Sequence, residues 1–225
     1  MRMPWKKRAI AEYSNVSISR DELRRRSRLL IIDDERPDLI DDLQKSGFAV
    51  DYFSDVDGSK LSVLDQPLYD LILLDFGGIG TKVGQEQGLT VLRHIKRTNP
   101  ATVVLAYTAK ALSADQADFY RIADGVLAKD AGVADSMEKI ELGLRKAHSL
   151  ENVWRGLLSL GGVNPGSDLD RTWQDLAVRA IEKPKELRSF RERVTSNLSG
   201  ATSRVAFILI EKVVELGVKA VMGAT

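Results

Sequence analysis

The chain has 225 residues, of which 44% are hydrophobic and 29% charged, and its formal net charge is +1. This composition is typical of a soluble globular protein with one sizeable core and a smaller second unit, and it argues against a broad basic surface for nucleic acid. Because the sequence contains no cysteine and only two histidines, disulfides, thiolate catalysis and cysteine-ligated metal sites are excluded.

From residue 29 to residue 149, short apolar runs alternate with helical patterns, which is the signature of βα units around a parallel sheet. The expected strands cover residues 29–32, 49–53, 71–74, 102–107 and 126–128. The expected helices cover residues 37–45, 60–64, 89–97 and 114–122, and a fifth begins near Asp135. We therefore predict an α/β protein with a (βα)5, flavodoxin-like, doubly wound parallel sheet.

The fifth helix is expected to run on as one long helix to Gly161, because its apolar residues keep a three-four spacing that far. Beyond the breaker GGVNPG, Ser167 can cap a helix, Pro184 can begin another, and Gly200 precedes the last one. The C-terminal third therefore reads as an all-helical module. The predicted domains are a basic N-terminal extension (1–27), an α/β domain (28–149) and a helical output or dimerisation module (150–225).

No segment is expected to span a membrane. The apolar stretch near the C-terminus is interrupted by Glu211, Lys212, Glu215 and Lys219, and the basic N-terminus lacks the apolar core of a secretory signal. We expect a cytoplasmic protein. The apolar surface of the last helix needs a cover, either from its own module or from a second subunit, so a dimer is expected.

Four of the apolar runs end in polar residues. Asp33 and Asp34 follow the first strand, Asp75 the third, Thr108 the fourth and Lys129 the fifth. The carboxyl ends of parallel strands form one edge of the sheet, where such folds build their sites, so these side chains are expected to meet. The carboxylates would repel one another by roughly 4 kcal/mol per pair at about 4 Å, which favours a bound hard cation such as Mg²⁺.

The order Asp-Asp, Asp, Thr, Lys on successive strand ends resembles the receiver domain of two-component response regulators, over about residues 28–149. The resemblance implies that Asp75 accepts a phosphoryl group from a histidine kinase or phosphotransfer protein. It also implies that Mg²⁺ is bound by Asp33, Asp34 and Asp75, with Gly77 contributing its backbone carbonyl. Thr108 would move toward the phosphoryl oxygens and Lys129 would pair with them. The protein would be a phosphoacceptor with at most self-dephosphorylation, not an enzyme.

Three features depart from that family's pattern. Val126 stands where an aromatic switch residue is usual, and Asp130 follows Lys129 where a proline is usual. The glycine-rich loop after Asp75 looks longer than normal; it lacks the spacing of a nucleotide site and is expected to be a flexible loop. Tyr107 is a candidate for part of the switch.

Several functions stay open at this point. The favoured output is self-association through the C-terminal helices or binding of a protein partner. The alternatives are a DNA-binding transcriptional regulator with a divergent helical domain, in which Arg188 and Arg191 would face phosphates, and a receiver-like scaffold that does not switch. A hydrolase of the haloacid dehalogenase type is disfavoured, because its nucleophile lies on the first strand in a DxD pattern and Asp33 and Asp34 are adjacent.

Overall fold

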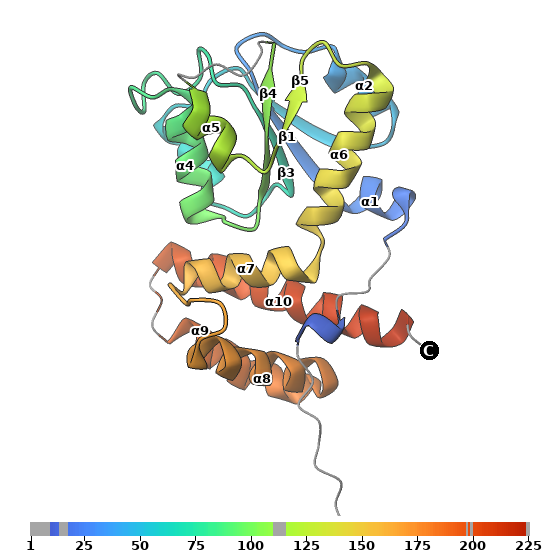
Figure 1. Ribbon diagram of the computed structural model, residues 1–225, viewed down its shortest axis with the longest axis vertical. Coiled ribbons are helices and arrows are strands. Elements are labelled where there is room, and N and C mark those ends of the chain that lie inside the picture. The colour runs from blue at the N-terminus through green and yellow to red at the C-terminus, as the bar shows by residue number, and fades with distance from the viewer. Residues whose placement is uncertain (1–9, 14–17, 110–115, 197, 199, 224–225) are drawn as a thin grey trace, which may run out of the picture. The chain divides into compact units, whose positions relative to one another are not determined.

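The computed structural model describes residues 10–13, 18–109, 116–196, 198 and 200–223, and its contacts divide the chain into two compact units (Figure 1). One unit, the α/β unit, comprises residues 18–147. The other, the helical unit, combines the described parts of residues 1–17 and 148–225. The contacts therefore divide the predicted N-terminal extension between the two units.

The α/β unit contains one five-stranded sheet in the order β2-β1-β3-β4-β5, and every neighbouring pair is parallel. Its strands are β1 (Arg28–Ile32), β2 (Ala49–Phe53), β3 (Leu71–Leu74), β4 (Val103–Thr108) and β5 (Gly125–Ala128). This order is that of the flavodoxin-like doubly wound fold, so the predicted fold class is confirmed. The central strands β1, β3 and β4 are almost fully buried, which explains why they read as continuous apolar runs.

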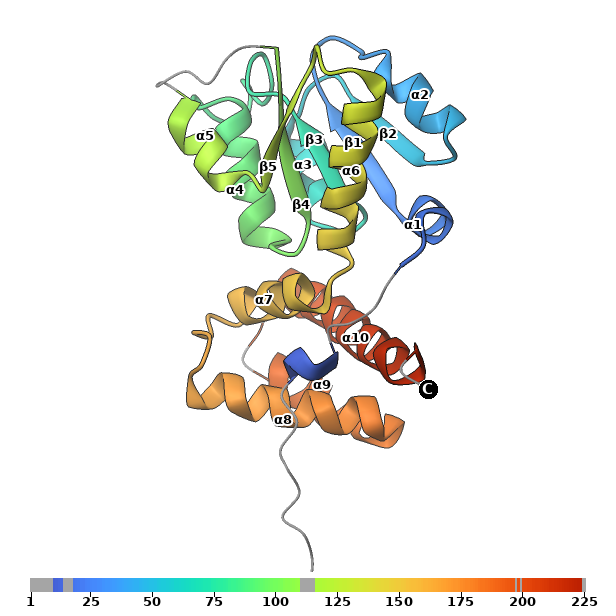
Figure 2. The same ribbon diagram turned by 45° about the vertical axis from the view of Figure 1, so that its right-hand side comes forward.

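Helices cover both faces of the sheet (Figures 1 and 2). One face is covered by α2 (Leu39–Lys45) and α6 (Val133–Ala147), and the other by α3 (Gly58–Leu64), α4 (Gly88–Thr98) and α5 (Ala117–Ile122). Alternate strand residues serve alternate faces: Leu30 and Ile72 pack in one cluster with residues of α3, α4 and α5 such as Phe119. On the opposite face α6 comes so close that a Cβ on Gly143 would lie 2.5 Å from Leu71 Cδ1.

Before the sheet begins, α1 (Arg20–Arg26) packs within the α/β unit. Ser19 caps it by accepting a hydrogen bond from the Glu22 amide at 3.2 Å. Leu23 is fully buried, and Arg20 pairs with Glu141 of α6 at 2.9 Å. Part of the basic N-terminal segment therefore contributes to the α/β unit.

The helical unit is built from helices of very different length around a core of its own, the longest being α10 with 24 residues. Its elements are η1 (Ile10–Tyr13), α7 (Leu150–Leu160), α8 (Asp168–Glu182), η3 (Pro184–Glu186), α9 (Leu187–Thr195) and α10 (Gly200–Gly223). Trp154 of α7 stacks on Phe190 of α9 with ring centroids 6.4 Å apart, and both rings are buried. Gly217 lets α10 approach α8, since a Cβ there would lie 2.3 Å from Ile181 Cδ1. The all-helical C-terminal part is thus confirmed.

The predicted single helix from residue 135 to residue 161 is wrong. Helix α6 ends at Ala147, and α7 begins at Leu150 after Ser149, whose backbone is extended and whose hydroxyl caps the new helix by accepting from the Asn152 amide. The apolar spacing continues through the break because each helix buries its own face, so periodicity alone did not reveal it. Across the described ranges, no helix combines the length and apolar character needed to cross a membrane.

A partly buried ion network lies at the amino edge of the sheet. The Asp124 carboxylate accepts hydrogen bonds from the Val104 amide at 2.8 Å and from Lys146 at 2.8 Å, and it also pairs with Lys96. Burial alone would raise the pKa of Asp124, but the Lys96 charge and these hydrogen bonds together bring that pKa below its ordinary value. The ionised form is therefore favoured in the folded state.

Replacing Asp124 with asparagine is expected to lower the free energy of unfolding by about 3 kcal/mol, because it leaves the largely buried Lys96 ammonium with the Thr102 carbonyl but without its opposite charge. Since the folded-state pKa of Asp124 is lowered, its stabilisation should be complete above the unfolded-state pKa of about 3.9 and be lost as the pH falls through the lower folded-state pKa. Urea unfolding of both proteins from pH 7 to pH 2 measures both effects. Asp118→Asn, at an exposed pair, is the control; an equal loss in both variants would contradict the prediction.

Candidate functional site

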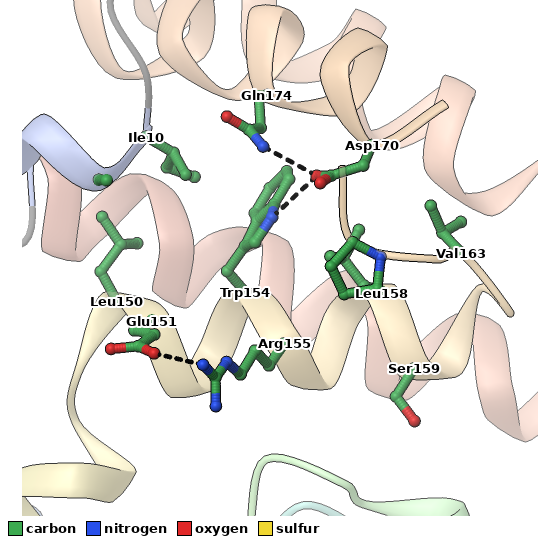
Figure 3. A pocket seen from close by; sticks show the side chains of 12 residues that line it. Ile10, Leu150, Glu151, Trp154, Arg155, Leu158, Ser159, Val163, Asp170 and Gln174 are labelled. Carbon is green, nitrogen blue, oxygen red and sulfur yellow. Dashed lines mark hydrogen bonds and ion pairs between the residues drawn. The ribbon is translucent and has the colours of Figure 1, made fainter. Parts of the chain in front are cut away.

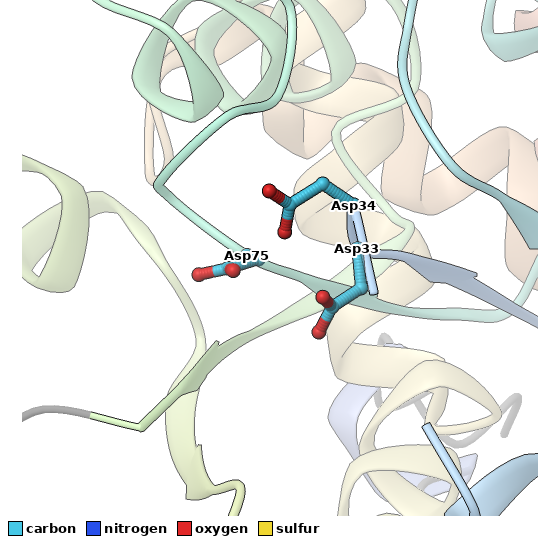
Figure 4. A group of neighbouring side chains, drawn as sticks. All are labelled: Asp33, Asp34 and Asp75. Atoms are coloured by element: carbon cyan, nitrogen blue, oxygen red, sulfur yellow. The ribbon is translucent and has the colours of Figure 1, made fainter. Parts of the chain in front are cut away.

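Three carboxylates meet at the carboxyl edge of the sheet (Figure 4). Asp33 and Asp34 follow β1 and Asp75 follows β3, the adjacent strand. One oxygen from each carboxylate lies within 4.8 Å of the others. Asp33 is fully buried, whereas the side chain of Asp75 is 16% exposed. The structure thus brings together the three aspartates named from the sequence.

Lys129, which follows β5, bridges two of these carboxylates. Its Nζ lies 2.6 Å from Asp33 Oδ2 and 2.8 Å from Asp75 Oδ2. Burial would lower the pKa of Lys129, but its hydrogen bonds to Asp33 and Asp75 and their charges outweigh burial and raise that pKa above its usual value. Burial raises the pKa of Asp33, although Lys129 and the Glu35 amide oppose this shift. The ammonium is therefore held charged in the site.

The donor set fits a hard divalent cation. All three converging groups are carboxylates, which are the ligands that Mg²⁺ and Ca²⁺ prefer. When all three are ionised, one ammonium leaves two negative charges uncompensated, and a divalent ion would neutralise these two. Asp33, Asp34 and Asp75 are the residues that could hold it.

Thr108 ends β4, and its backbone is tied to the site through the Lys129 amide, which donates to the Thr108 carbonyl at 2.8 Å. Its side chain is buried, and its hydroxyl lies 3.3 Å from the hydroxyl of Tyr120 on α5. Gly77 lies two residues beyond Asp75, with open space where a side chain would stand. The use of its carbonyl as a metal ligand stays a prediction.

The glycine-rich loop that follows Asp75 is held at several points. The Gly80 amide donates to Asp55 Oδ1 at 2.7 Å, and the Gly88 amide donates to the Phe76 carbonyl at 3.1 Å. Gly78 has a φ of +71°, and a Cβ there would lie 2.6 Å from Asp34 Oδ2. The absence of a side chain at Gly78 therefore gives Asp34 its place in the cluster.

Sequence reasoning missed two residues that shape the site, Gly78 and Tyr120. The sequence predicts only a flexible loop after Asp75, and nothing in its run of glycines indicates which glycine meets Asp34. Nothing in the spacing of α5 indicated that Tyr120 would reach Thr108. Tyr107 was named, and it is buried with Lys129 Nζ 5.5 Å from its ring centroid.

A cavity of about 370 Å³ opens beside the acidic cluster, between α2 and α6. Asp33, Tyr107 and Lys129 form its floor, and Asp38 and Ser136 lie on its walls. Burial and the charge of Asp33 raise the pKa of Tyr107, so its hydroxyl stays neutral. Asp33 and Lys129 can therefore be reached through this cavity.

A larger cavity of about 680 Å³ lies within the helical unit, between α7, α8 and η1 (Figure 3). Its wall carries a polar group built around the buried Asp170, whose Oδ1 accepts from Trp154 Nε1 at 3.1 Å and from Gln174 Nε2 at 3.0 Å. The Gly166 amide donates to the other oxygen at 2.6 Å. These contacts satisfy Asp170 internally, so its role is to join α7, α8 and the turn between them.

Comparison with known proteins adds the following. No family model matches the sequence, and no curated protein matches it. Among solved structures, the chain is similar to a CheY-like response regulator receiver domain protein from Methanospirillum hungatei JF-1, with 22% identity over 54% of this chain and 95% of that one, and a TM-score of 0.45. It is also similar to the receiver domain of NtrX from Brucella abortus, with 22% identity over 52% of this chain and 97% of that one, and a TM-score of 0.44. The chemotaxis protein CheY4 of Vibrio cholerae matches at 17% identity over 52% and 97%, with a TM-score of 0.42.

Gly78→Ala is expected to lower the affinity of the cluster for Mg²⁺ by about tenfold, because the new Cβ displaces Asp34. The positive φ adds a cost to stability of about 1 kcal/mol. Titration calorimetry with Mg²⁺ measures the affinity. Gly77→Ala is the matched control, since a Cβ at Gly77 meets nothing within 4 Å and its φ is not positive. Equal affinities for the two variants would contradict the role given to Gly78.

Proposed function

We propose that the chain is a response regulator of a two-component phosphorelay, in which Asp75 accepts a phosphoryl group from a histidine kinase or phosphotransfer protein. The observation that carries the proposal is the contact of Lys129 with both Asp33 and Asp75 inside a cluster of three carboxylates. A site with excess negative charge, one ammonium and a nucleophile that solvent can reach suits phosphoryl transfer, which needs positioning and neutralisation of charge.

In this reaction a carboxylate oxygen of Asp75 attacks the phosphorus of a phosphohistidine. The new P–O bond forms as the P–N bond breaks, and the leaving imidazole nitrogen keeps the bonding electron pair and takes up a proton. The Lys129 ammonium, now 2.8 Å from Asp75 Oδ2, is placed to follow the charge onto the phosphoryl oxygens. Its raised pKa keeps it protonated through the physiological range.

A divalent ion is part of the proposal. Asp33, Asp34 and Asp75 would hold Mg²⁺, with the Gly77 carbonyl as a further ligand. When bound, the ion would neutralise charge that develops on the phosphoryl oxygens. Because Lys129 already contacts two of the three carboxylates, it would have to release Asp33 or Asp75 as the site fills. The proposal also places the chain in the cytoplasm, in keeping with a sequence without cysteine.

The proposed output is self-association, or binding of a protein partner, through the helical unit. Its last helix, α10, leaves large apolar side chains exposed beside a face that is buried in the unit. The exposed apolar residues of α10 are Phe207, Ile208, Val221 and Met222. Met222 is 72% exposed, and large exposed apolar side chains gathered on one element are a feature of interaction surfaces.

Asp75→Asn is expected to abolish phosphoryl uptake, because an amide oxygen cannot form a stable acyl phosphate. The full chain is incubated with Mg²⁺ and phosphoramidate, and intact-mass spectrometry measures how many phosphoryl groups each chain carries. Hydroxylamine, which cleaves acyl phosphates, should then remove the label. Asp118→Asn, with an exposed carboxylate on α5, is the control and should be labelled like the native chain. Labelling of the Asp75 variant, or failure of the native chain to be labelled, would overturn the proposal.

Self-association should increase when the site is loaded with beryllofluoride and Mg²⁺. Met222→Glu is expected to reduce the associated fraction at least about tenfold, because it places a charge in the apolar contact. Light scattering after gel filtration measures the mass. Leu142→Glu on α6 is the matched control, since Leu142 is also well exposed. A mass that does not change on loading would leave partner binding as the output.

The alternatives make other predictions. Against DNA binding, the two arginines of α9 named for this role already pair with carboxylates: Arg188 with Glu192 at 2.7 Å, and Arg191 with Glu211. A scaffold that does not switch would be indifferent to Asp75→Asn in both assays. The labelling and mass measurements therefore distinguish a switching response regulator from a scaffold. Salt-dependent retention on duplex DNA, weakened by Arg188→Ala or Arg191→Ala, would identify the DNA-binding alternative.

A further inference from the structure

An aromatic row joins the segment after Asp75 to Thr108 by way of α5. Phe76 is the residue after Asp75, and its amide donates to Asp75 Oδ1 at 2.7 Å. The Phe76 ring meets the Phe119 ring edge to face, with centroids 5.3 Å apart, and Phe119 meets Tyr120 in the same way at 5.8 Å. Phe119 is fully buried, so the row is fixed within the core.

The row ends in a hydrogen-bonded cluster of three side chains. The hydroxyl of Tyr120 lies 3.3 Å from Thr108 Oγ1 and 2.8 Å from Gln116 Oε1. Gln116 and Tyr120 both belong to the start of α5, so this helix holds the Thr108 hydroxyl through Tyr120. The Tyr120 ring is itself placed by Phe119, and the position of its hydroxyl is therefore linked to the backbone beside Asp75.

We propose that Tyr120 is a positioning residue for Thr108: its hydroxyl holds Thr108 Oγ1 on the α5 side while Asp75 is unmodified, and releases it when a phosphoryl group is bound. This inference rests on the proposed phosphorylation of Asp75 and adds a residue that the sequence analysis did not assign. It gives the chain an aromatic coupling between the site and α5, although β5 carries Val126, an aliphatic residue that packs against the same core.

The hydrogen bond between the Tyr120 and Thr108 hydroxyls favours the state in which α5 holds Thr108 over the state in which Thr108 contacts a phosphoryl group. A neutral hydrogen bond contributes enough to change an equilibrium constant by about two- to tenfold. Removing the Tyr120 hydroxyl should therefore weaken the hold of α5 on Thr108 and favour its contact with the phosphoryl group. Tyr120→Phe keeps the ring and its contact with Phe119, so the change is confined to the hydroxyl.

The test is a double-mutant cycle on the full chain, read out as the dissociation constant of beryllofluoride at saturating Mg²⁺ by fluorine NMR. Tyr120→Phe should tighten binding by about two- to tenfold. In a Thr108→Val background the same substitution should have no effect, because Tyr120 acts through the Thr108 hydroxyl. Thr108→Ser should restore the effect. A merely structural role for Tyr120 would change binding equally in all three backgrounds.

Tyr69→Phe is the matched control, since Tyr69 precedes β3 at the opposite edge of the sheet and its hydroxyl donates to Asp51 at 3.0 Å. It should leave the dissociation constant unchanged. Urea midpoints of all variants show that they are folded. An unchanged constant in Tyr120→Phe, or an equal shift with valine at position 108, would overturn the inference. Failure of the native chain to bind beryllofluoride would instead overturn the proposed function.

Discussion

The crowding of Asp33, Asp34 and Asp75 at one edge of the sheet is the constraint on which the rest of this protein depends. Carboxylates this close repel one another, and the parallel sheet keeps them there because the ends of β1 and β3 are fixed side by side. Lys129 relieves only part of the repulsion, by contacting Asp33 and Asp75. The site therefore has excess negative charge, which a bound cation would neutralise.

The amino and carboxyl edges of the sheet differ in how far their clustered charges are balanced. At the amino edge, the Asp124 carboxylate is matched by Lys96, Lys146 and a backbone amide, and its contribution is to stability. At the carboxyl edge, negative charge exceeds positive charge among the clustered groups, and solvent reaches Asp75. The Asp124 charge at the amino edge is compensated within the folded protein, whereas the carboxyl edge has excess negative charge that a cation could neutralise. That difference is the physical basis for placing the function at the carboxyl edge.

The helical unit has the features of an independent packing unit. Helix α7 begins with its own serine cap, and Asp170 and Trp154 tie its helices together through a buried hydrogen bond. Its cavity is largely apolar, and the polar group at its wall is satisfied internally. Beyond that core, α10 exposes several large apolar side chains. The proposed chemistry and the proposed output thus belong to different parts of the chain.

The five strands, their parallel arrangement and the residues at their ends could be predicted from the sequence, because strands buried on both faces must be continuously apolar and the first polar residue marks where each one leaves the core. The helical character of the last third was predictable because its apolar residues recur every three or four positions and cap or breaker residues separate the runs. The break at Ser149 was not, since two helices that each bury one face can keep a common spacing. The contact of Gly78 with Asp34 and that of Tyr120 with Thr108 were decided only by the tertiary structure. Both join residues from separate elements, and such pairs are set by how loops and helices pack on the sheet, which no local pattern records.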